Sequence, residues 1–134
     1  MFSHAIVGIG EFERALRFYR AVLGALGLRE RFCDVEKSWA GWQPAAGGRP
    51  LFVISKPYDG APHQAGNGQM VAFMADTRAQ VRLVHEIALR EGGSCEGPPG
   101  LRPHYHANYY GAYFRDTEGN KLCVVCHHPE GDTA

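Results

Sequence analysis

Residues 109 to 127 read Tyr-Tyr-Gly-Ala-Tyr-Phe-Arg-Asp-Thr-Glu-Gly-Asn-Lys-Leu-Cys-Val-Val-Cys-His. Two runs rich in aromatic and β-branched residues flank a polar segment, which predicts two strands joined by a turn. Because side chains alternate between the two faces of a strand, we expect Cys123 to share a face with Lys121, Val125 and His127. Cys126 then points to the opposite face, so the Cys-x-x-Cys spacing does not indicate a shared metal site.

Working outward from this stretch, the chain shows two similar halves. The patterns predict strands over 3–9, 28–35, 38–43, 50–55 and 69–75, and helices over 11–26 and 77–91. Thr77 and Gln80 form a capping box at the start of the second helix. A Gly- and Pro-rich passage covers 97–103. Similar elements in each half indicate a duplicated strand–helix–three-strand unit.

The predicted fold is therefore α+β, with two βαβββ modules that form a curved mixed sheet around a concave cup and helices on the outside. We expect a single domain over 1–134, with module 1 at about 1–57, a linking loop at about 58–68, module 2 at about 69–128 and a tail at 129–134. The concave surface of two such sheets is where a small ligand is expected to bind.

Composition narrows the class of partners. Lys and Arg number 14, as do Asp and Glu, and no segment concentrates basic residues, so nucleic-acid binding is not expected. No stretch has the length and apolar character of a signal peptide or a membrane span. The four cysteines are expected to be reduced thiols in a cytoplasmic protein.

Three segments resemble the vicinal oxygen chelate superfamily, which includes glyoxalase I, extradiol dioxygenases and the fosfomycin- and bleomycin-resistance proteins. They are His4 in Ser-His-Ala-Ile-Val-Gly-Ile, the helix Phe12-Glu-Arg-Ala-Leu-Arg-Phe-Tyr19, and Phe114-Arg-Asp-Thr-Glu-Gly-Asn120. The family's usual form of the last motif is Phe-x-Asp-Pro-Asp-Gly-Asn, and Thr117 here replaces the proline. The resemblance covers nearly the whole chain and implies a homodimer that binds a small molecule.

The resemblance also implies positions for a divalent metal in the cup. Carried over by position, these fall on His4, Cys123, near Phe52, and near Met70 or Gln69. Phe52 cannot bind a metal and Met70 is a poor ligand for hard ions, so the remaining imidazole and thiolate suit zinc. His106 or His104 could supply a third ligand. This site requires that the first and last strands run side by side, so that His4 meets Cys123.

Two functions remain open from the sequence. One is a zinc-dependent lyase or isomerase-type enzyme that acts on a small oxygen-rich or carbonyl substrate, with His4, Cys123 and His106 as ligands. The alternative is a metal-free protein that sequesters a planar small molecule, in which Cys123 is a small buried hydrophobe. Aromatic candidates for lining a cup are Trp39, Trp42, Tyr109 and Tyr113, and the expected pocket residues are Phe52, Met70, His104 and Tyr110.

Overall fold

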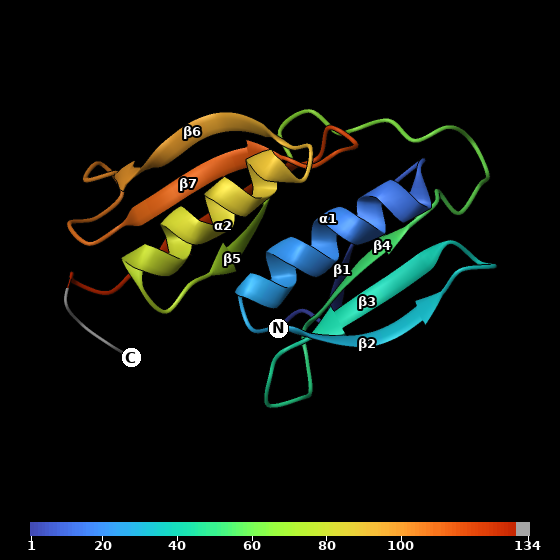
Figure 1. The fold of residues 1–134 in the computed structure, drawn as a ribbon, viewed down its shortest axis with the longest axis horizontal. Helices are drawn as coiled ribbons and strands as arrows, with labels where there is room; N and C mark the ends of the chain where they lie inside the picture. The colour runs from blue at the N-terminus through green and yellow to red at the C-terminus, as the bar shows by residue number, and fades with distance from the viewer. Residues whose placement is uncertain (131–134) are drawn as a thin grey trace.

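The structure, a computed structural model, describes residues 1–130 of the chain. It contains two βαβββ modules that lie side by side, with both helices on one face of the sheets (Figure 1). Module 1 comprises β1 (His4–Gly8), α1 (Phe12–Ala25), β2 (Arg29–Asp34), β3 (Trp39–Gln43) and β4 (Leu51–Ser55). Module 2 comprises β5 (Val71–Met74), α2 (Arg78–Arg90), β6 (Ser94–Leu101), β7 (Tyr110–Arg115) and β8 (Lys121–Cys126). The predicted α+β fold of two repeated modules is confirmed.

The strands form two separate four-stranded mixed sheets. Their orders are β1-β4-β3-β2 and β5-β8-β7-β6, and in each sheet the first strand of the module is parallel to the last while the other pairs are antiparallel. The first strand of each module is an edge strand, so β1 and β5 each have one edge that pairs with no other strand within residues 1–130. The predicted curved sheet is therefore divided between the two modules.

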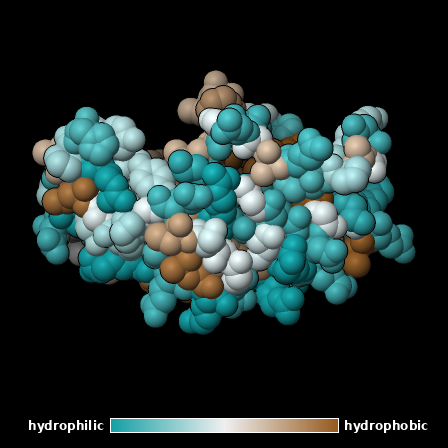
Figure 2. Space-filling view, turned by 90° about the horizontal axis from the view of Figure 1, so that it is seen from above, coloured by the Kyte–Doolittle hydropathy of each residue, from teal (hydrophilic) through white to brown (hydrophobic). Residues whose placement is uncertain are grey.

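A single apolar core lies between the helices and the sheets. It includes residues from both modules, and the rings of Phe52 on β4 and Phe73 on β5 meet across the module boundary with their centres 5.1 Å apart. The ring of Tyr19 on α1 packs at 5.1 Å from Phe52 and at 6.2 Å from Trp42. The face of the molecule in Figure 2 is mostly hydrophilic, with apolar residues in small separate groups. Burial of the shared core is the main force that holds the modules together.

The predicted capping box starts the second helix and also ties it to the first. The Gln80 backbone N–H donates to the Thr77 hydroxyl at 3.1 Å, and the Gln80 side-chain oxygen accepts from the Asp76 N–H at 2.8 Å. The Gln80 amide nitrogen donates to the carbonyl of Ala25, the last residue of α1, at 3.0 Å. Neither α1 nor α2, the helices of residues 1–130, has the length and apolar character that a membrane span requires.

The Gly- and Pro-rich passage after α2 forms a strand that its composition did not predict. β6 spans Ser94–Leu101, contains Pro98 and Pro99, and pairs with β7 through two register shifts. Proline is tolerated there because β6 is an edge strand, so a missing N–H costs no ladder hydrogen bond on the open side.

The turn between β7 and β8 contains a buried carboxylate that organises its polar groups. Asp116 is 4% exposed, and its Oδ1 accepts the backbone N–H groups of Glu118 at 2.8 Å and Asn120 at 2.9 Å. Its Oδ2 accepts from the Asn120 side-chain amide at 2.9 Å and from the hydroxyl of Tyr19 on α1. This network holds the turn in one conformation and connects it to module 1.

Glu118 and Asn120 extend this connection to the backbone of module 1. The Glu118 carboxylate accepts the N–H of Gly10 at 2.8 Å and that of Glu11 at 3.1 Å, at the start of α1, and lies 3.3 Å from the Arg14 guanidinium. The Asn120 amide donates to the Gly8 carbonyl at the end of β1 at 2.8 Å. We call Asp116, Glu118 and Asn120 the clasp. It satisfies free N–H groups at a helix start, where a negative charge is favourable.

Candidate functional site

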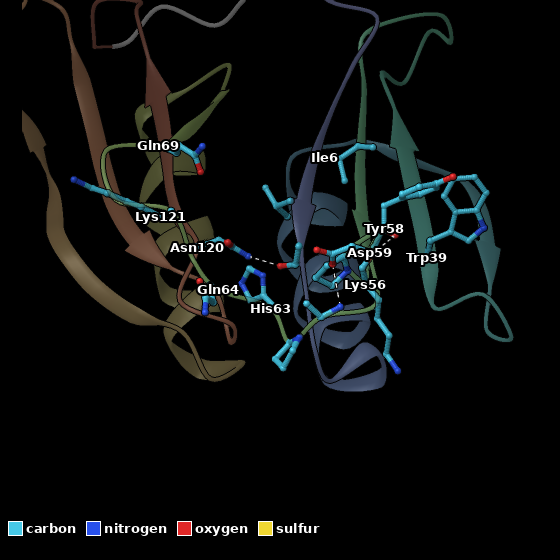
Figure 3. A pocket seen from close by; sticks show the side chains of 17 residues that line it. Ile6, Trp39, Lys56, Tyr58, Asp59, His63, Gln64, Gln69, Asn120 and Lys121 are labelled. Atoms are coloured by element: carbon cyan, nitrogen blue, oxygen red, sulfur yellow. Dashed lines mark hydrogen bonds between the residues drawn. The ribbon is translucent and has the colours of Figure 1, made fainter.

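A pocket with both polar and apolar lining residues lies between the two modules, on the side of the sheets away from the helices (Figure 3). Its volume is about 670 Å³. Ile6 of β1 and Trp39 of β3 line it from module 1, and Gln69 and Lys121 line it from module 2. The segment between β4 and β5 passes along its edge and adds Tyr58, Asp59, His63 and Gln64. We call this side of the molecule the concave side.

The strand alternation expected for β8 sets which of its side chains reach the concave side. Leu122, Val124 and Cys126 belong to the core beneath α2, whereas Cys123 does not. The Cys126 thiol lies 3.6 Å from the Asp76 carbonyl. The prediction that Cys123 and Cys126 point to opposite faces is therefore confirmed, and the two thiols do not form a joint site.

Cys123 is fully buried although it points to the concave side, because two tyrosines cover it. The Tyr109 hydroxyl lies 3.6 Å from the Cys123 sulfur and 2.9 Å from the Tyr113 hydroxyl. Burial raises the pKa of the Cys123 thiol, and it also raises the pKa of both phenols. At neutral pH this cluster consists of an uncharged thiol and two uncharged phenols.

The loop between β6 and β7 places aromatic rings beside this cluster. The ring centres of His104 and Tyr105 are 4.3 Å apart, and those of Tyr105 and Tyr109 are 4.8 Å apart. His106 Nδ1 accepts the Asn108 backbone N–H at 3.1 Å, and His106 Nε2 lies 2.8 Å from Nδ1 of His127. Both ring nitrogens of His106 are therefore engaged by neighbouring groups.

His4 lies apart from Cys123. It is exposed at the start of β1, and its Nδ1 is 2.9 Å from the Ser3 hydroxyl. β1 pairs with β4 and β8 pairs with β5 and β7, and β1 and β8, both within the described residues, are not in contact. Within one chain the structure thus does not bring the imidazole and the thiol together as the zinc hypothesis requires.

The residues at the implied metal positions do not fit a divalent ion in this chain. The Cys123 sulfur is covered by Tyr109 and Tyr113, and burial raises the pKa of its thiol, so a metal would have to reach a closed-off sulfur and displace its proton. Nowhere in residues 1–130 do three or more His, Cys, Asp or Glu side chains gather as a possible metal site. The groups at and around Cys123 are an uncharged thiol and two phenol hydroxyls.

Phe52 lies against the core, where its ring contacts Tyr19 and Phe73, and its cross-strand partner Trp42 is also a core residue. Leu51 and Val53, on either side of Phe52, point to the other face of the sheet. Because a shift of one residue along a strand exchanges the two faces, the position expected near Phe52 falls on one of these neighbours. The residue of module 1 that corresponds to Cys123 is therefore Val53, which is also unable to bind a metal.

Phe52 and Met70 nevertheless line one pocket. It is a separate apolar pocket of about 530 Å³ between the β1–β4 side of module 1 and the edge of β5. Tyr110, in contrast, points toward α2, where Arg82 donates to its hydroxyl at 3.2 Å and the Arg78 guanidinium lies 5.3 Å from its ring centre. Tyr110 does not line the concave pocket.

Two cations converge on a tyrosine at the concave side of module 2. The Arg102 guanidinium lies 5.5 Å and the Lys121 ammonium 5.7 Å from the centre of the Tyr113 ring. Strand alternation predicted that Lys121 shares the face of Cys123, but no sequence signal marked Arg102. Its position depends on how the β6–β7 loop folds back over the sheet.

Comparisons with known proteins agree with this architecture. The family model of the Glyoxalase/Bleomycin resistance protein/Dioxygenase superfamily matches residues 1–124. A glyoxalase/bleomycin resistance protein from Albidiferax ferrireducens T118 is 37% identical, with a TM-score of 0.84 over 94% of this chain and 98% of that chain.

Two further structures share the fold at lower identity. A glyoxalase-related enzyme from Fulvimarina pelagi is 17% identical, with a TM-score of 0.75 over 100% of this chain and 95% of that chain. Lactoylglutathione lyase from Agrobacterium tumefaciens is 20% identical, with a TM-score of 0.64 over 94% and 92%. No curated protein matches the sequence. From the family model and the 37% identical structure, the chain belongs to the Glyoxalase/Bleomycin resistance protein/Dioxygenase superfamily.

Proposed function

We propose that this protein binds a small planar molecule in its concave pocket without a metal ion. Proteins of the superfamily generally bind small molecules, and many use a divalent metal. The observation that carries the proposal is the state of Cys123, which is an uncharged thiol closed off beneath Tyr109 and Tyr113. The position where the resemblance implies a metal ligand therefore contributes to a neutral aromatic surface.

The pocket has the size and lining that such a ligand needs. Its volume of about 670 Å³ falls within the range of roughly 300–1,000 Å³ for small-molecule sites. Trp39 and Tyr58 offer aromatic rings on the module 1 side, and Gln69 offers an amide group on the other. Flat rings favour a planar guest, and the amide can fix its orientation.

The zinc-dependent lyase or isomerase is less well supported. It needs His4, Cys123 and His106 at one ion, yet within one chain His4 lies on a strand that does not contact β8. His106 already has both ring nitrogens engaged. A thiolate at Cys123 would also have to form against the raised pKa of the buried thiol.

Tryptophan fluorescence separates the two functions. Trp42 is 2% exposed in the core and Trp39 lines the pocket, so quenching by a bound ligand should come from Trp39. We expect planar compounds to quench fluorescence and raise the melting temperature equally with and without EDTA. The Trp39→Phe variant should lose the quenching. Binding or turnover that appears only after zinc is added, and that disappears in Cys123→Ala, would refute the metal-free proposal.

We also propose that the protein is a homodimer assembled through the free edges of β1 and β5. Members of the superfamily generally form dimers. The apolar pocket beside these edges contains Phe2 and Met74, which are 79% and 78% exposed. Open strand edges and exposed apolar side chains favour association. Light scattering on the wild type should give twice the chain mass, and Met74→Lys should give the mass of one chain; a monomeric wild type would refute the proposal.

A further inference from the structure

The concave side of module 2 carries two positive charges beside one tyrosine ring. Lys121 and Arg102 both lie over the Tyr113 ring, at 5.7 Å and 5.5 Å from its centre. Within residues 1–130, neither cation is within ion-pair distance of a carboxylate. Two like charges gathered beside one ring repel each other, and a bound anion would relieve this repulsion.

The contacts of Arg102 hold it in place without cancelling its charge. Its guanidinium donates to the Gly100 carbonyl at 2.9 Å and to the Pro98 carbonyl at 2.8 Å. These neutral acceptors come from the end of β6, so they fix the guanidinium relative to the sheet. Two of its five N–H donors can satisfy these bonds while others remain for a ligand.

A nearby acidic side chain is already engaged. Glu96 lies 2.5 Å from the Arg115 guanidinium, which lowers the pKa of that carboxyl group, and the charge of Lys121 lowers it further. The phenols of Tyr109 and Tyr113 stay protonated because burial raises their pKa. The surface therefore presents cations and neutral O–H groups, which suit an acceptor-rich anion.

The rings around these cations limit the shape of the guest. Tyr105 and Tyr109 pack 4.8 Å apart beside the covered Cys123. Lys121 also lines the pocket, but its side chain is directed away from the pocket (Figure 3) and toward Tyr113, so these cations and rings form one group beside the pocket on the concave side of module 2.

We propose that the planar ligand of the concave side is an aromatic carboxylate, whose carboxylate is bound by Lys121 and Arg102 while its ring lies against Tyr105 and Tyr109. This inference rests on the proposed function and specifies its class of ligand. It also predicts rejection of a cationic ligand of the same shape, because a cation would meet Lys121 and Arg102 at short range.

Three probes with one ring system and different charge test the inference: 2-naphthoate, 2-naphthamide and 2-naphthylmethylamine. Their affinities for the full chain would be measured by calorimetry with EDTA present. We expect the carboxylate to bind at least tenfold more tightly than the amide, and the amine to bind more weakly than the amide. A higher salt concentration should weaken binding of the carboxylate but leave binding of the amide unchanged, because salt screens interactions between charges.

Lys121→Met should lower the affinity for 2-naphthoate about tenfold and leave the affinity for 2-naphthamide unchanged. Lys37→Met, at an exposed position in the turn between β2 and β3, makes the same change in net charge and should alter neither affinity. Arg102→Lys keeps the charge but loses the fork of donors, so an intermediate loss is expected. A melting curve of each variant verifies that it is folded.

Equal affinities for the three probes, or a Lys121→Met variant that binds the carboxylate like the wild type, would overturn the inference and leave the proposed binding function intact. Tighter binding of the amine would also overturn it. If none of the three probes binds, the planar-ligand function fails together with the inference.

Discussion

Replacement of Glu118 by alanine should destabilise the protein by removing the acceptor at the start of α1. The carboxylate accepts two backbone N–H groups, at 2.8 Å and 3.1 Å, and its side chain is only 7% exposed. Hydrogen bonds to charged acceptors contribute about 1.5–3 kcal/mol each. Water can partly replace the carboxylate at the Gly10 and Glu11 amides, and the Arg14 pair is too exposed to add much.

We therefore expect the free energy of unfolding to fall by about 2–3 kcal/mol in Glu118→Ala. With a urea m-value of about 1.5 kcal/mol/M, the unfolding midpoint should fall by about 1.3–2 M. Glu118→Gln keeps one oxygen acceptor but loses the charge, so its loss should be roughly half as large. Glu13→Ala removes another acid from the first turn of α1, where the structure assigns it no hydrogen bond, and should shift the midpoint little.

Urea denaturation should be followed by both fluorescence and circular dichroism, because together the two signals show whether the modules unfold together. Both tryptophans lie in module 1, so fluorescence reports on that module while circular dichroism reports on both. Because the core is shared, the two transitions should coincide in the wild type. A Glu118→Ala midpoint equal to that of Glu13→Ala would refute the assignment of a stabilising role to the clasp.

Three other outcomes follow from the structure. Burial and Asp116 raise the pKa of Tyr19 in the folded protein. The stability that the protonated phenol contributes is therefore complete below the unfolded pKa of about 10 and is lost as the pH rises above it. Chemical denaturation between pH 9 and 11 should show that the free energy of unfolding falls more steeply with pH in the wild type than in Tyr19→Phe. Gly24→Ala should stabilise the protein by about 0.5–1 kcal/mol, because nothing lies near an added Cβ at this position of α1. Gly93→Ala should destabilise it, because the new Cβ would lie 2.5 Å from the Arg115 carbonyl oxygen. The melting temperature should rise in the first variant and fall in the second. In native protein treated with iodoacetamide, mass spectrometry should find label on the exposed Cys95 and none on Cys123, and rapid labelling of Cys123 would contradict its closure beneath Tyr109.

The repeated order of elements and the face of each β8 side chain follow from the sequence alone. Apolar residues at helical spacing identify α1, and the capping box identifies the start of α2. Alternation along β8 places Cys123 and Cys126 on opposite faces without knowledge of the rest of the chain. These features depend on neighbours in sequence, where the periods of 3.6 and 2 residues act directly.

The make-up of the candidate site depends on contacts between distant parts of the chain. The one-residue offset that turns Phe52 into the core comes from the pairing of β3 with β4, and the position of Arg102 over Tyr113 comes from the fold of the β6–β7 loop. Likewise, the sequence showed Glu118 only as part of a motif, and the tertiary structure placed it at the start of α1. Local periodicity specifies which way a side chain points from its own strand, but packing of the whole chain decides what it meets there.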